Sequence, residues 1–169
     1  MSLKKISYRK KLSRVMKQLV DGAFLTTSTD NEINTMTIGW GSIGYIWNRP
    51  VFTVLVRESR YTYKMLNRSK AFTVSLPLQG QLTEELAYCG SKSGENCDKF
   101  NDLDLDTLPG RILSTPFIAE CDIFYECRTV CRNRVQSPDV EDKIEKNSYS
   151  DGDYHTIYHG EILAAYRKE

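Results

Sequence analysis

The chain has 169 residues, with 23 Lys and Arg against 22 Asp and Glu and a formal net charge of +1. This length suits one domain whose core needs no disulfide or metal to hold it. Because positive and negative residues nearly balance, the composition gives no support for nucleic acid or an anionic membrane as the main partner. There is no apolar run of signal-peptide or membrane length, and the five cysteines have no zinc-ribbon or CxxC spacing, so we expect a cytoplasmic protein.

The first third of the chain predicts one helix followed by strands. Apolar residues recur at helical spacing over residues 8–21, and Asp21-Gly22 ends the pattern. Residues 23–28 and 33–40 flank a turn-forming Thr-Asp-Asn tripeptide and predict a hairpin. The β-branched apolar run over residues 51–56 predicts a strand buried on both faces.

The middle of the chain predicts two short helices around a strand. Residues 60–68 favour a helix with Ser59 as its N-cap, and residues 71–76 alternate as a strand does. Residues 82–89 predict a second helix, which we expect Gly90 to end.

The last third predicts two long strands around a loop. Residues 119–131 alternate as a half-buried strand, residues 132–152 lose periodicity and predict an exposed loop, and residues 154–166 predict a closing strand. The chain has no internal repeat and no domain boundary. The expected fold is mainly β, a barrel with short crossing helices.

Two neighbouring segments point to a flat ring that carries a phosphate. The first supplies backbone N–H groups, glycine and an indole: Asn34, Thr35, Met36, Thr37, Ile38, Gly39 and Trp40. The second supplies two guanidiniums and hydroxyls at a predicted helix start: Arg57, Ser59, Arg60, Tyr61 and Thr62. A helix N-terminus and arginine both favour phosphate oxygens. Flavin mononucleotide (FMN) is a common cofactor of this shape.

A third segment offers further contacts to such a cofactor. The small polar loop Ser91, Lys92, Ser93 and Gly94 can approach phosphate or ribityl oxygens. Reduction of a flavin places negative charge at one edge of its ring, which a nearby cation stabilises. Lys99 is the first candidate for this cation and Lys92 the second.

At these residues the sequence resembles the flavin reductase-like proteins of the FMN-binding split barrel, which include flavoredoxin. The matching blocks are Asn34 to Thr37 with Gly39-Trp40-Gly41, Trp47 with Pro50, Arg57 to Thr62, Cys89 to Gly94, Asp98-Lys99-Phe100, Asp153 to Thr156, and Gly160-Glu161-Ile162. The resemblance implies one flavin reductase-like domain over residues 1–169, with Phe100 joining the cofactor-binding set. It also implies a homodimer with FMN at the subunit interface and a role in reduction or electron transfer.

Simpler interpretations remain open for several of these residues. Arg57 and Arg60 are also typical of a solvated surface, and the Ser-Gly loop of a plain turn. Trp40 and Trp47 are also typical of a core or a dimer interface, which for Trp47 we favour over flavin contact. His155 and His159 share one face of a predicted strand, but no carboxylate or cysteine completes a metal site, and we predict none. A redox role for Cys89 and Cys97, which border the polar loop, is a further alternative, although the sequence gives no sign of a lowered thiol pKa.

No catalytic residue can be assigned from the sequence. It contains no Gly-x-Ser-x-Gly nucleophile elbow and no Gly-x-Gly-x-x-Gly fingerprint, so NAD(P)H would have to meet the flavin directly. Two functions remain open: an enzyme that takes hydride from NAD(P)H onto FMN, and an electron carrier that another redox protein reduces. A cofactor-free structural barrel is the third alternative.

Overall fold

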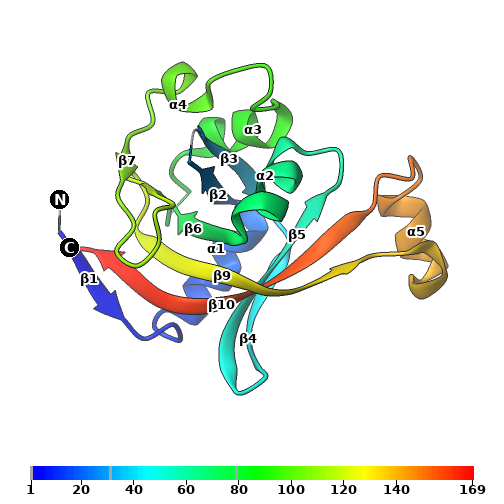
Figure 1. Cartoon of the computed structure of the whole chain (residues 1–169), viewed down its shortest axis with the longest axis horizontal. Helices are drawn as coiled ribbons and strands as arrows, with labels where there is room; N and C mark the ends of the chain where they lie inside the picture. The colour runs from blue at the N-terminus through cyan, green and yellow to red at the C-terminus, as the bar shows by residue number, and fades with distance from the viewer. Residues whose placement is uncertain (1, 31, 79) are drawn as a thin grey trace.

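The computed structural model describes residues 2–30, 32–78 and 80–169 (Figure 1). The helices are α1 (Leu12–Asp21), α2 (Tyr61–Ser69), α3 (Thr83–Ser91), α4 (Lys99–Asp102) and α5 (Asp142–Ser148), with the short 3₁₀ helix η1 (Ser137–Asp139) before α5. The strands are β1 (Leu3–Ile6), β2 (Ala23–Thr29), β3 (Glu32–Ile38), β4 (Gly41–Ile46), β5 (Arg49–Arg57), β6 (Ala71–Leu76), β7 (Thr107–Leu108), β8 (Phe117–Ile118), β9 (Ile123–Arg134) and β10 (His155–Lys168).

One antiparallel sheet of eight strands organises the molecule. Its order is β3-β2-β6-β9-β10-β5-β4, and β1 pairs with the end of β10. Among the described residues β3 and β4 do not pair with each other, so the sheet does not close into a barrel. The strands β9 and β10 extend as a twisted ribbon away from the body of the sheet, with α5 at its far end (Figure 1).

Two apolar clusters hold the fold together. The main cluster joins α1 and α2 to strands β2, β3, β5, β6, β9 and β10, with the fully buried Phe52, Phe72 and Tyr125 at its centre. The second cluster joins α3 and β8 to β2, β9 and β10 and contains Phe117 and Phe124, whose ring centroids are 5.0 Å apart. Burial of aromatic side chains such as these is the dominant stabilising term.

One glycine of the resemblance motif has a packing role. A Cβ atom at Gly160 would lie 2.4 Å from Cζ of Phe72 and 2.9 Å from Cβ of Cys127. This close approach occurs beside a register shift between His159 and Gly160 on β10. Only glycine fits where β10 lies so closely on the core.

The predicted elements are largely confirmed. The structure contains the opening helix, the β2–β3 hairpin, the strands over residues 51–56 and 71–76, both central helices and the two long C-terminal strands. The predicted turn of this hairpin includes Asn31, which lies outside the described residues. None of the described helices is long and apolar enough to cross a membrane.

Several predicted details are wrong. The residue before α2 is Arg60, and the Ser59 hydroxyl donates to Asp153 instead of capping the helix. Helix α3 continues through Gly90 to Ser91, and Leu55 of β5 is only half-buried because it borders a cavity. Strand β9 begins at Ile123 rather than residue 119. The predicted loop over residues 132–152 contains η1 and α5; neither helix has a buried residue, whereas Tyr149 just after α5 is buried.

Candidate functional site

A cavity of about 200 Å³ lies where β3, β5, α2 and β10 meet. Its lining residues come from four separate parts of the chain: Met36, Thr37, Ile38, Gly39, Trp40, Leu55, Arg57, Arg60 and His155. Seven of these nine residues belong to the two segments that the sequence singled out. The fold therefore brings the donor-rich segment and the arginine segment to one place.

Strand β3 presents backbone groups to this cavity because it is an edge strand. Among the described residues it pairs with β2 alone, and the Thr35 carbonyl faces away from β2 to accept a hydrogen bond from Lys99. In an antiparallel strand the backbone direction repeats every two residues, so the N–H and C=O of Thr37 face the same unpaired side. The Thr37 hydroxyl donates to the Leu86 carbonyl at 2.5 Å, which fixes the strand against α3.

Arg60 stands between the start of α2 and the end of α3. Its backbone is extended just before the helix, and its Nη2 donates to the Gly90 carbonyl. The first-turn N–H groups of a helix have no intrahelical partner and favour anions. A half-buried guanidinium beside them gives this end of the cavity a positive character.

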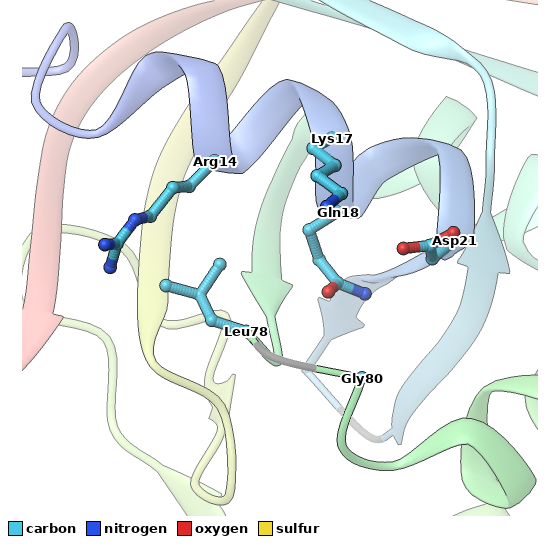
Figure 2. A pocket seen from close by; sticks show the side chains of 6 residues that line it. All are labelled: Arg14, Lys17, Gln18, Asp21, Leu78 and Gly80. Atoms are coloured by element: carbon cyan, nitrogen blue, oxygen red, sulfur yellow. The ribbon is translucent and has the colours of Figure 1, made fainter.

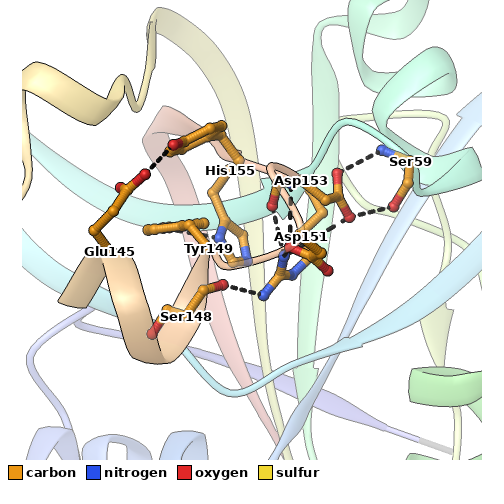
Figure 3. A network of polar contacts seen from close by, with 9 residues as sticks. Ser59, Glu145, Ser148, Tyr149, Asp151, Asp153 and His155 are labelled. Carbon is orange, nitrogen blue, oxygen red and sulfur yellow. Dashed lines mark hydrogen bonds and ion pairs between the residues drawn. The ribbon is translucent and has the colours of Figure 1, made fainter. Parts of the chain in front are cut away.

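Arg57 has a different set of partners, all on the connection from β9 to β10. We call residues 135–154, which include η1 and α5, the α5 segment. The Arg57 guanidinium donates to the Asp153 carbonyl at 2.5 Å and to the Ser148 carbonyl at 2.8 Å. It also forms ion pairs of 3.5 Å with Asp151 and 3.8 Å with Asp153 (Figure 3). Arg57 thus lines the cavity and fastens the α5 segment to β5.

His155 is the first residue of β10 and pairs directly with Arg57 of β5. Its ring lies 5.0 Å from that of Trp40, and its Nδ1 is 3.0 Å from the Tyr149 hydroxyl. Burial, followed by the charges of the Arg57 and Arg60 guanidiniums, lowers the pKa of His155 to about 4, although the Asp153 carboxylate acts in the opposite direction. The imidazole is therefore neutral near pH 7.

Other predicted residues form a layer behind the cavity. The Asn34 amide donates to the Thr62 hydroxyl at 2.8 Å, which joins β3 to α2. The polar loop lies directly on this pair, because a Cβ at Gly94 would be 2.0 Å from Oδ1 of Asn34 and 3.2 Å from Cδ1 of Tyr61. Only glycine allows the loop to come so close.

Lys99 lies beside β3 and is only 3 % exposed. Its Nζ donates to the Thr35 carbonyl at 2.8 Å and to the Cys89 carbonyl at 3.1 Å. Burial lowers the pKa of Lys99, and burial raises the pKa of the Cys89 thiol to about 11. Cys89 is therefore a protonated, buried thiol, and Lys99 is held between β3 and α3.

The remaining predicted residues do not line the cavity. The Ser91 hydroxyl donates to the Tyr88 carbonyl, and Ser93 accepts from Glu95 and Cys97 within its own loop. Lys92 is exposed at the end of α3, and Phe100 packs against the second core cluster. Their predicted contacts with a cofactor stay predictions.

The sequence reasoning missed two lining residues and one supporting residue. Leu55 and His155 line the cavity, and Tyr149 contacts His155. The signal for His155 was present in the Asp153-Tyr154-His155 block of the resemblance. Tyr149 carried no signal because it lies in a stretch without periodicity. His159 is separate from this group: it lies beside Thr53 and Trp47.

A second cavity, of about 440 Å³, lies between α1 and the segment that follows β6 (Figure 2). Arg14, Lys17 and Asp21 of α1 border it together with Leu78 and Gly80. As far as the described residues form it, its wall combines both signs of charge and contains no aromatic residue. None of the predicted cofactor-binding residues lines it, so the smaller cavity is the candidate site.

Comparison with known proteins finds flavoredoxins and a flavin oxidoreductase among the similar structures. The flavoredoxin of Methanosarcina acetivorans is 28% identical and matches with a TM-score of 0.68 over 88% of this chain and 68% of its own. The flavoredoxin of Desulfovibrio vulgaris (Miyazaki F) is 26% identical, with a TM-score of 0.68 over 88% and 69% of the two chains. The NADH:FAD oxidoreductase SgcE6 of Streptomyces globisporus C-1027, at 21% identity, shares the fold, with a TM-score of 0.66 over 99% and 88%.

The family profile described as "Flavin reductase like domain" matches residues 16–169. That range includes every residue of the candidate cavity and all strands of the main sheet except β1. The chain belongs to the flavin reductase-like family.

Proposed function

We propose that this protein binds FMN in the candidate cavity and uses it to transfer electrons. The observation that carries the proposal is the meeting of the 36–40 segment with Arg57 and Arg60 around one hollow. Flavoredoxins are among the similar structures, which supports a flavin as the ligand. The flavin ring would lie along β3 and Trp40, with its phosphate toward Arg60 and the start of α2.

The chemistry of the lining fits this orientation. A flavin ring has one hydrogen-bonding edge and one apolar edge, and the site offers backbone N–H groups beside Met36, Trp40 and Leu55. One half-buried guanidinium and one helix start suit a single terminal phosphate. No second phosphate site adjoins them in the part of the chain that the structure describes, which favours FMN over FAD.

A bound flavin accepts hydride or electrons and passes them on. The residues of this chain would hold the ring, exclude water from one face and place positive charge near it through Arg60 and the buried Lys99. We take NAD(P)H as the first candidate donor, since an NADH:FAD oxidoreductase shares the fold.

Electron transfer without NAD(P)H turnover is the second candidate function. The likeness to two flavoredoxins, at 28% and 26% identity, supports it. Anaerobic stopped-flow mixing of the holoprotein with NADH and with NADPH separates the two functions. Rapid loss of the visible flavin absorbance supports the reductase, and an unchanged spectrum supports a carrier that another protein reduces.

The phosphate assignment can be tested with one arginine and a matched control. A charge-assisted hydrogen bond contributes ~1.5 to 3 kcal/mol, so Arg60→Ala should weaken FMN binding about tenfold to a hundredfold and riboflavin binding much less. Arg68→Ala removes an exposed arginine at the other end of α2 and should change neither affinity. Mass spectrometry of the released cofactor tests FMN itself. Equal losses for both ligands, or a cofactor other than FMN, would contradict the assignment.

We also propose a homodimer that completes the site. The β4–β5 hairpin exposes Tyr45, Ile46 and Trp47, Trp40 just before β4 is exposed as well, and β4 is an edge strand of the sheet as described. Trp47 has a φ of 52°, an unfavourable backbone for a bulky residue, and its side chain remains 55% exposed. Such a patch suits a two-fold partner. Sedimentation should give a dimer at micromolar concentration; a flavin-bound monomer would contradict it.

A further inference from the structure

Tyr149 and His155 form a buried, hydrogen-bonded pair. The predicted cofactor contacts do not account for it. The tyrosine is 5% exposed and the histidine 9%. Their hydroxyl and Nδ1 are 3.0 Å apart, and this is the only hydrogen bond of the Tyr149 hydroxyl among the described residues. The other ring nitrogen of His155, Nε2, has no partner among those residues, while the ring lines the candidate cavity.

Tyr149 is held from three sides, so its hydroxyl has a fixed position. Its ring stacks on that of Tyr154 at 4.9 Å with an interplanar angle of 21°. The Arg57 guanidinium lies over the Tyr149 ring, 5.6 Å from its centroid. The Tyr154 hydroxyl donates to Glu145 of α5, which fastens the stack to the helix (Figure 3). Every one of these partners except Arg57 belongs to the α5 segment.

The charges around His155 favour its neutral form. Arg57 pairs with it across the strands and Arg60 stands across the cavity, while Asp153 is already engaged by Arg57 and Ser59. In a neutral imidazole one nitrogen donates and the other accepts. A phenol O–H is a stronger donor than an imidazole N–H, so the favoured pairing is O–H of Tyr149 to Nδ1 of His155. The proton of the ring then resides on Nε2.

We propose that Tyr149 is a positioning residue that fixes His155 as the Nε2–H tautomer, so that the imidazole presents an N–H donor to the ligand in the cavity. The ligand half of this proposal rests on the proposed flavin function. Oxidised flavin carries carbonyl oxygens and ring nitrogens that accept hydrogen bonds. Reduction increases the negative charge on the ring, so a fixed neutral donor binds the reduced form more strongly than the oxidised form.

The tautomer can be measured without any flavin. In a His159→Gln background His155 is the single histidine, and ¹⁵N chemical shifts of its ring report which nitrogen carries the proton. At pH 7 we expect the Nε2–H tautomer, and in Tyr149→Phe a mixture of both tautomers. Tyr154→Phe is the matched control: it removes one hydroxyl from the same stack but not the bond to His155, and should leave the tautomer unchanged.

The functional half is measured on the FMN-loaded protein by redox titration. A mixture of tautomers presents the Nε2–H donor only part of the time, so Tyr149→Phe should reduce the preference for reduced over oxidised FMN about twofold, seen as a more negative midpoint potential. Tyr154→Phe should keep the wild-type potential. Tyr149→Phe should have no further effect in a His155→Gln protein, because the tyrosine acts through the histidine.

The possible outcomes have distinct meanings. An Nδ1–H tautomer in the wild type, or an unchanged tautomer in Tyr149→Phe, overturns the proposal even if FMN binds as expected. The expected tautomers with an unchanged potential overturn the positioning of the ligand. Failure of the protein to bind any flavin overturns the proposed function and the ligand half with it, whereas the ¹⁵N spectra still decide the Tyr149–His155 pairing.

Discussion

Two irregular connections of this molecule are fastened by opposite charges. The connection between β7 and β8, residues 109–116, wraps around the carboxylate of Glu126: its Oε1 accepts from the backbone N–H groups of Arg111, Ile112 and Leu113, each at 2.9 Å. The α5 segment is instead fastened by the Arg57 guanidinium, which donates to two backbone carbonyls. Both anchors come from a strand of the main sheet.

The two connections differ in how deeply their anchoring side chains are buried. Glu126 is fully buried, and its Oε2 accepts from the Tyr166 hydroxyl, so each carboxylate oxygen has a partner. The Arg57 side chain is 26% exposed, and no residue of α5 itself is buried. Water can replace the partners of Arg57 but not those of Glu126. The first connection is therefore part of the core, and the second is a local unit that can open beside the cavity.

Removal of the buried anchor should have the largest effect. Glu126→Ala leaves three backbone N–H groups and a tyrosine hydroxyl without their acceptor, so we expect the free energy of unfolding to fall by more than about 3 kcal/mol, measured by urea denaturation. Glu126→Gln keeps one oxygen for the N–H groups and should cost less. A loss below about 1 kcal/mol in the alanine variant would remove the distinction between the two anchors.

Removal of the exposed anchor should act locally. Arg57→Met takes away the donor of the Ser148 and Asp153 carbonyls, a loss of about 2 kcal/mol that should appear as opening of the α5 segment. Trypsin should then cut at Lys143 or Lys146 at least about tenfold faster, while the main urea transition shifts little. Cleavage at the wild-type rate would show that the segment does not depend on Arg57.

The stability of the protein should also depend on pH through His155, which is hydrogen-bonded to Tyr149 of the α5 segment. His155 has a pKa of about 4 in the folded state against 6.5 ordinarily, so above pH 6.5 it is neutral in both states and costs nothing. As pH falls below 6.5 the unfolded chain binds a proton that the folded one does not, and stability is lost. By pH 5 the loss should reach about 2 kcal/mol relative to pH 7.5.

The control for this pH effect is a variant without the imidazole. His155→Gln should lack that part of the loss, and the difference between the two urea series isolates it. If both proteins lose the same stability between pH 7.5 and pH 5, the histidine is not buried as a neutral group.

The smallest effect concerns the outermost ion pair of the α5 segment. The Asp151 side chain is 67% exposed and lies 3.5 Å from Arg57. Exposed ion pairs contribute little, so Asp151→Asn should change stability by less than about 0.5 kcal/mol and leave trypsin cleavage near the wild-type rate. A large effect would mean that the segment depends on its carboxylates rather than on its carbonyls.

Much of this protein could be predicted from its sequence because the signals are local. Helical spacing predicted α1, strand alternation predicted β6, and turn residues predicted the β2–β3 hairpin. Motif order indicated the family, and with it the 36–40 segment and the two arginines that line the cavity. Periodicity and turn chemistry depend on neighbours in the chain, so the sequence alone carries them.

Only the tertiary structure decided what each of these residues touches. Arg57 and Arg60 stand three positions apart in one motif, yet Arg57 fastens the α5 segment and Arg60 meets the end of α3, because one ends a strand and the other precedes a helix. Tyr149 reaches His155 from a stretch without periodicity. Such contacts depend on how distant segments pack together, and no spacing along the chain records that.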